Sequence, residues 1–89
     1  MTKIKLVVII KNKNLEKRFT YTIDAKRYNT MIVWHVSENI DVEFEVGDLV
    51  SAYVDSEFGI FHIFYEEFMD FDGTIRFQPN YNDIRMIFE

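Results

Sequence analysis

Apolar and polar residues alternate in several segments of this chain, with the period of two that is typical of β-strands. The clearest example is Ile40–Val46, in which four apolar residues alternate with three acidic ones. Arg18–Ile23 also alternates. In Lys3–Ile10, Val7 and Ile9 on the face opposite Ile4, Leu6, Val8 and Ile10 predict a strand covered on both sides, and the polar run KNKNLE lies between the two segments. Because so short a connection cannot form a parallel crossover, the pattern predicts an antiparallel hairpin.

Two later segments fit either a helix or a strand. In Asp24–Val36, Asp24 could cap a helix, but the β-branched run MIVW favours a strand from about Thr30 to Val36. Phe58–Phe71 is nearly all aromatic and acidic. As a helix, the segment would carry its aromatic residues on one face and its acidic residues away from it. As β structure, it would form a strand over Gly59–Tyr65 followed by a second strand.

Two dipeptides are typical of tight turns. Gly47-Asp48 is expected to turn the chain after Ile40–Val46, so that Leu49–Val54 returns. Asp72-Gly73 predicts a two-residue hairpin that would place Phe68 opposite Phe77.

These patterns predict one domain over residues 1–89 that is mainly β. We expect an antiparallel sheet or small barrel, with at most one short helix; an α+β arrangement is the alternative. Ile84–Phe88 is expected to form the last strand, at an edge.

The composition suits a small folded domain. Hydrophobic residues make up 48% of the chain and aromatic residues 17%, which is enough for a core in 89 residues. The chain has no cysteine, which excludes disulfides, zinc–thiolate sites and cysteine nucleophiles. Ile4–Ile10 is too short to span a bilayer and lacks a signal-peptide cleavage pattern. We therefore expect a soluble protein of the cytoplasm.

Charge is distributed unevenly along the chain. Met1–Val36 carries eight lysines and arginines against two carboxylates, a net charge of +6. Ser37–Glu89 carries two arginines against thirteen carboxylates, a net charge of −11, and the two parts give the total of −5. Such an asymmetry favours a folded surface with separate charged regions.

The chain contains no motif that predicts catalysis or a cofactor. His35 and His62 are the only histidines, and both stand among apolar residues, where a structural role is usual. The serines lack a nucleophile elbow, and there is no glycine-rich phosphate loop or paired-histidine metal motif. The segment Asp70–Gly73 resembles the start of a calcium loop, but the further ligands are missing. We predict a protein that is not an enzyme and needs no cofactor or metal.

The basic first third raises the possibility of nucleic-acid binding. Lysines and arginines there stand near Phe19, Tyr21 and Tyr28, and basic grooves with aromatic platforms hold single strands in small β-barrels. The competing interpretation is that these lysines protect turns and strand edges. This function is the alternative to the one that follows.

The acidic row of Ile40–Val46 suggests a different function. Alternate residues of a strand lie about 6.6 Å apart, so Asp41, Glu43 and Glu45 would form a regular line of negative charge. That spacing is of the same order as the spacing of backbone phosphates in DNA. An ordinary solvated face is the competing interpretation, but basic residues are scarce after Val36, which favours a binding surface. Further carboxylates that could extend it are Asp48, Asp55, Glu57, Glu66, Glu67, Asp70 and Asp72, with Tyr53, Phe58, Tyr65 and Phe71 as apolar contacts.

In size, acidity, lack of cysteine and aromatic-rich β pattern, the chain resembles the small acidic proteins with which phages take over their hosts. Among these it is similar to DNA mimics that block HU-type nucleoid proteins, nucleases or transcription factors. The resemblance implies, as partner, a basic DNA-binding protein of a bacterial host, met in the host cytoplasm, without direct contact to nucleic acid or membrane. The basic first third departs from uniformly acidic mimics, and it suggests self-association as a homodimer.

Overall fold

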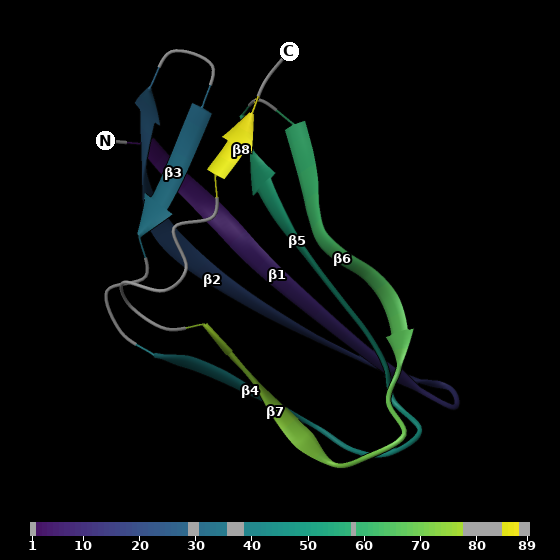
Figure 1. Ribbon diagram of the computed structural model, residues 1–89. Coiled ribbons are helices and arrows are strands. Elements are labelled where there is room, and N and C mark those ends of the chain that lie inside the picture. Colours follow the sequence, from purple (N-terminus) through teal and green to yellow (C-terminus); the bar gives the residue numbers. More distant parts are fainter. Residues whose placement is uncertain (1, 29–30, 36–38, 58, 78–84, 88–89) are drawn as a thin grey trace.

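The computed structural model describes residues 2–28, 31–35, 39–57, 59–77 and 85–87, and every regular element among them is a strand (Figure 1). In chain order the strands are β1 (Thr2–Asn12), β2 (Leu15–Tyr28), β3 (Met31–His35), β4 (Ile40–Phe44), β5 (Leu49–Ser56), β6 (Gly59–Phe68), β7 (Gly73–Phe77) and β8 (Arg85–Ile87).

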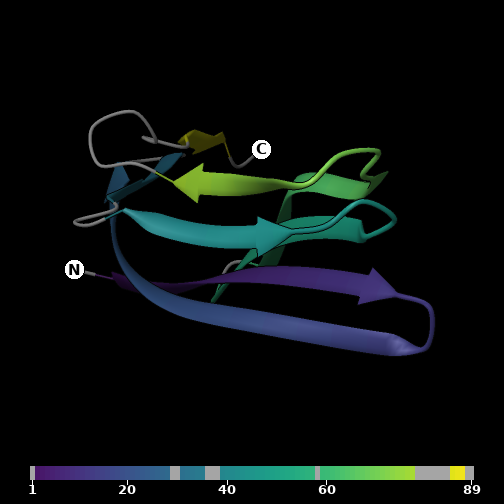
Figure 2. The same ribbon diagram turned by 90° about the horizontal axis from the view of Figure 1, so that it is seen from below.

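The strands form two antiparallel sheets. The large sheet has six strands in the order β6-β5-β1-β2-β3-β8, and the small sheet consists of β4 and β7. Figure 2 shows the small sheet as a separate layer beside the long β1–β2 hairpin. The predicted class, mainly β with antiparallel pairing, is therefore confirmed. The described strands form open sheets and not a closed barrel, and the described residues contain no helix.

The core lies between the inner faces of the two sheets. Alternation in β1 turns Ile4, Leu6, Val8 and Ile10 inward, and each of them is almost completely buried. The small sheet covers this row with its own inward side chains, and β5 extends the core on the other side of β1. The main contributions from these strands are Val42, Phe44, Val50, Ala52, Val54 and Phe77.

Three predicted elements are confirmed, and the structure decides a fourth segment that fitted either a helix or strands. The first hairpin is longer than expected, because β1 and β2 leave only Lys13 and Asn14 as the turn, with Lys13 at a φ of 55°. The predicted strand near Thr30–Val36 is β3, and the aromatic segment forms the strand β6 and no helix. The expected last strand is β8, which pairs with β3 at an edge of the large sheet.

The predicted Asp72-Gly73 hairpin is wrong. Phe68 lies opposite Leu49 of β5, whereas Phe77 lies opposite Ile40 of β4. A two-residue type I′ turn needs a positive φ at its glycine, and Gly73 does not adopt one. Gly73 instead allows close approach of an aromatic side chain, because a Cβ at this position would lie 2.6 Å from Cζ of Phe44.

The second predicted return, from Ile40–Val46 into Leu49–Val54, is also not a hairpin. β4 pairs with β7 and β5 pairs with β1 and β6, so the turn between them passes from one sheet to the other. Two hydrogen bonds stabilise this crossing. The Gly47 N–H donates to the Met69 carbonyl at 2.7 Å, and the Met69 N–H donates to the Asp48 carbonyl at 2.8 Å. The two loops thus bind each other and together carry the chain between the sheets.

Candidate functional site

The predicted acidic row lies on β4. Val42 and Phe44 point into the core, and Asp41 and Glu43 are exposed on the opposite face. Glu45 is exposed immediately after the strand. The alternation that predicted the row is therefore the same property that builds it: one face of β4 must cover the core, and the other carries the carboxylates.

The first carboxylate of the row is already paired within the protein. Asp41 lies directly opposite Arg76 of β7, whose Nε and Nη2 donate to its two oxygens at 2.7 and 3.2 Å. The hydrogen bonds from this guanidinium lower the pKa of Asp41, and the carboxylate raises the pKa of Arg76. No described lysine or arginine forms an ion pair with Glu43 or Glu45, so these two residues carry the uncompensated charge of the row.

Asp48, which was predicted as a surface contact, has a structural position. Its side chain is only 6% exposed. One carboxylate oxygen accepts the Glu45 N–H at 2.8 Å, and the other accepts Nδ2 of Asn12 at 2.8 Å. The backbone hydrogen bond, followed by the one from Asn12, lowers the pKa of Asp48. Asp48 thus joins the β4–β5 turn to the tip of the β1–β2 hairpin, and we leave it out of the candidate surface.

The remaining predicted carboxylates are all exposed, but they lie in two separate regions. Asp70 and Asp72 lie in the β6–β7 loop beside Glu45, since Asp72 accepts the Val46 N–H at 2.9 Å. Glu66 and Glu67 lie near the end of β6, against the start of β5. By contrast, Asp55 and Glu57 lie at the far end of β5, roughly 20 Å along the strand at about 3.3 Å per residue.

Exposed apolar side chains gather at the same end of the molecule as most of these acids. Phe68 is 66% exposed and lies opposite Leu49, which is partly exposed; Val46 and Phe71 lie in the two adjoining loops. The Phe71 ring makes an edge contact with Phe44, with 5.3 Å between the ring centroids. We call this region the acidic end; it comprises Glu45, Glu66, Glu67, Asp70 and Asp72 with Val46, Leu49, Phe68 and Phe71.

Sequence reasoning found only part of the apolar surface. Phe71 lies at the acidic end as predicted, but Tyr53 and Tyr65 flank His62, whose ring stacks on Tyr65 with 4.4 Å between centroids. Phe58 lies outside the described residues. Val46 was expected to point inward because it continues the alternation of β4, yet β4 ends before it. The extra residues of a bulge in β6 shift the faces of that strand, which no local pattern predicts.

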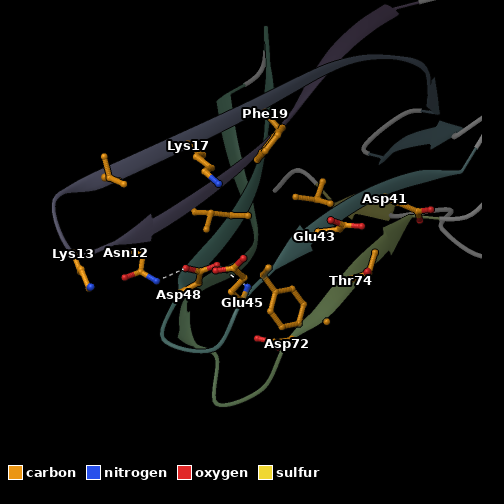
Figure 3. A pocket seen from close by; sticks show the side chains of 15 residues that line it. Asn12, Lys13, Lys17, Phe19, Asp41, Glu43, Glu45, Asp48, Asp72 and Thr74 are labelled. Atoms are coloured by element: carbon orange, nitrogen blue, oxygen red, sulfur yellow. Dashed lines mark hydrogen bonds between the residues drawn. The ribbon is translucent and has the colours of Figure 1, made fainter.

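A cleft of about 1020 Å³ runs between β4 and the β1–β2 hairpin (Figure 3). Core residues such as Ile10, Val42 and Phe44 line it, together with Phe19 of β2. Figure 3 also shows that Lys17 reaches into the cleft from the hairpin side. Its lining contains more negative than positive groups, namely Asp41, Glu43, Glu45, Asp48 and Asp72 against Lys13 and Lys17.

The basic residues of the first third do not form a continuous groove within the described side chains. Lys3 forms an ion pair with Asp24, and Lys11 donates to Glu66 at 2.9 Å. The bond to Glu66 raises the pKa of Lys11. Lys5 lies opposite Asp55 in the ladder. Carboxylates from both parts of the sequence are therefore interleaved with these lysines on the outer face of the large sheet.

The histidines and serines are the other groups that could carry chemistry. His62 is exposed, whereas the side chain of His35 and the whole of Ser37 lie outside the described part of the structure. Among the described residues, no group of three or more histidine, aspartate or glutamate side chains is placed to hold a metal ion. Nor does this part of the chain contain a helix with the length and apolarity needed to cross a bilayer.

Comparison with protein-family models, curated proteins and solved structures found no match to this chain.

The hydrogen bonds of Asp48 predict a pH dependence of stability. Because the folded state lowers the pKa of Asp48 below its ordinary value of 3.8, the folded protein binds fewer protons there than the unfolded chain. The stabilisation is present above the ordinary pKa and is lost as the pH falls through the folded value. We expect Asp48→Asn to lower the urea midpoint at neutral pH and to flatten its decline below about pH 4.

The matched control is Asp70→Asn, which removes an exposed carboxylate of the neighbouring loop. Its urea midpoint should stay close to that of the unmodified protein both at neutral pH and below about pH 4. If the two variants behave alike, the Asp48 hydrogen bonds do not stabilise the junction between the hairpin and the turn.

Proposed function

We propose that the protein is a non-enzymatic inhibitor that binds a basic DNA-binding protein and occupies its nucleic-acid site, as a mimic of DNA. The observation that carries the proposal is the exposed row of Asp41 and Glu43 on β4 and Glu45 just after it, which continues into the carboxylates of the acidic end. A bacterial nucleoid protein of the HU type, or a nuclease, has the chemistry of such a partner.

The spacing and the charge of the row support this proposal. On a strand its carboxylates stand about 6.6 Å apart, which lets lysines and arginines that hold successive phosphates reach them instead. Two of the three, Glu43 and Glu45, have no cationic partner among the described residues, so these two can bind a basic surface without breaking an internal ion pair. Opposite charges also accelerate encounter, which helps an inhibitor to compete with DNA.

The apolar groups of the acidic end supply what charge alone lacks. Exposed ion pairs contribute little affinity, whereas aromatic side chains that become buried at an interface often dominate it. Phe68 and Phe71 are large, exposed and surrounded by carboxylates. The combination suits a basic protein surface with apolar patches better than it suits a uniform polyanion-binding groove.

The proposal is tested by displacement. A purified HU-type nucleoid protein is first bound to a short fluorescent DNA duplex. The proposed inhibitor is then added, and the fluorescence anisotropy of the DNA is measured. We expect the anisotropy to fall to the value of free DNA. The inhibitor concentration that gives half of this fall should rise steeply as the salt concentration is raised. The assay is repeated with a basic DNA-binding nuclease in place of the nucleoid protein. If the anisotropy stays unchanged in both assays, the proposal is contradicted.

Direct binding to the duplex in the absence of the nucleoid protein would favour the alternative, a nucleic-acid-binding module that uses the basic first third. Capture from bacterial lysate, with and without nuclease treatment, separates the two further. A mimic retains DNA-binding proteins after the DNA is destroyed, whereas a nucleic-acid-binding module loses them.

A further inference from the structure

The small sheet ends at an edge of β4 that is unpaired within the described part of the chain. β4 pairs with β7 on one side, and on its other side no described strand forms a ladder with it. Alternate residues of β4 therefore direct backbone N–H and C=O groups outward along this edge. Such an edge can accept an additional strand, because the main-chain groups provide the hydrogen bonds whatever the partner's sequence.

The cleft runs along this same edge. Its lining includes the inward residues Val42 and Phe44 as well as the outward residues Asp41 and Glu43. Side chains from both faces of one strand can border a single cleft only where the cleft follows the strand's edge. Figure 2 shows β4 between β7 and the long hairpin, so an added strand would extend the small sheet towards β2.

We propose that this cleft binds an extended basic segment of the partner, which adds to the edge of β4 as a third strand of the small sheet. This inference rests on the proposed function and specifies how the basic protein is held. The β4–β7 ladder provides the template: Arg76 on β7 lies opposite Asp41 and binds it across the strands. A cation on the added strand would meet the row from the other side in the same way.

Charge determines the composition of the added strand. Glu43 lies opposite the uncharged Thr74 in the existing ladder, so its ion-pairing capacity is available to a new neighbour. Residues opposite Asp41, Glu43 and Glu45 would be lysine or arginine. The alternate residues would be apolar and would lie over Ile10 and Phe19 in the cleft.

The same charges select β4 over the other wall of the cleft. The edge of β2 beyond its pairing with β3 also borders the cleft, but Lys17 and Lys13 stand on that side. A basic segment therefore places its cations towards β4. The edge of β6 that pairs with no described strand is a useful internal comparison, because it lacks this row of acids.

The test uses an acetylated and amidated octapeptide of alternating lysine and valine, with binding measured by calorimetry. Two further peptides carry N-methyl groups on all lysine amides or on all valine amides, which blocks one peptide edge or the other without changing the charge. We expect at least one of them to bind about tenfold or more weakly than the parent. Binding by the parent should also slow hydrogen exchange in Ile40–Phe44 and leave Gly59–Phe68 unchanged.

Equal binding of all three peptides would overturn strand addition while leaving an acidic docking surface intact. Protection of β6 in place of β4 would overturn the assigned edge. Failure of the parent peptide to bind, together with successful displacement of DNA by the protein, would also overturn this inference and leave the proposed function standing. Failure of both assays would remove the two proposals together.

Discussion

Replacing Leu6 by alanine should destabilise the protein by about 3–5 kcal/mol, as expected for removal of a fully buried leucine side chain from a packed core. Leu6 is 0% exposed and lies in β1, between Tyr21 of β2 and Val54 of β5. The inward neighbours of Leu6 belong to strands that are themselves fixed in a ladder, so the cavity cannot close easily. Domains of this size are typically stable by only about 5–15 kcal/mol, so much of the population could unfold.

Leu15→Ala is the matched control, because the same atoms are removed from a side chain that is 71% exposed at the start of β2. Its effect on the free energy of unfolding should stay within about 0.5 kcal/mol. Urea denaturation followed by circular dichroism measures both. If Leu6→Ala does not fold at all, Leu6→Val provides a smaller perturbation, for which we expect about 1 kcal/mol. Equal effects of the Leu6 and Leu15 substitutions would show that the core is not centred on β1.

The strands could be predicted from the sequence because alternation and β-branching act locally. Lys3–Ile10 and Arg18–Ile23 carry their own inward and outward faces, and the short turn between them allows only one antiparallel pairing. The pairing of β4 with β7 and of β5 with β1 could not be predicted in this way. Those pairings depend on contacts between segments far apart in the chain, and a local turn motif such as Asp72-Gly73 gives no information about them.

The candidate site was predictable to the same extent. The row on β4 follows from the rule that a half-buried strand exposes alternate residues, and its exposure is as expected. The ion pair between Asp41 and Arg76 could not be predicted, because it depends on the register of β4 against β7. Asp48 was misplaced for a similar reason: its burial depends on Asn12, at the tip of a hairpin that is distant in sequence.

The uneven charge along the chain is partly cancelled by folding. Lys3 is paired with Asp24 from its own third of the sequence, whereas Lys11 is paired with Glu66 from the acidic part. Of the exposed carboxylates without an ion pair among the described residues, Glu45, Asp70 and Asp72 lie around the β4–β5 turn and the β6–β7 loop, and Glu43 precedes them on β4. Net charge alone would not have located this surface; it emerges from which acids the ladders leave without partners.

Reversing the charge of the row should abolish displacement of DNA. We expect Glu43→Lys combined with Glu45→Lys to weaken competition for the HU-type protein by about 100-fold or more. The substitution removes two attractive contacts and places two cations against a basic partner, so both effects act in the same direction. Because both side chains are exposed, the urea midpoint should remain close to that of the unmodified protein.

Asp55→Lys combined with Glu57→Lys is the matched control, since it changes the net charge by the same amount, from −5 to −1, at the far end of β5. General charge attraction would make the two double variants equally weak, and this outcome would contradict a defined contact at β4. Retained competition by the Glu43 and Glu45 variant would remove the row from the interface. We expect instead that the control competes within about threefold of the unmodified protein, because at physiological salt the Debye length of about 8 Å confines each charge to its own neighbourhood.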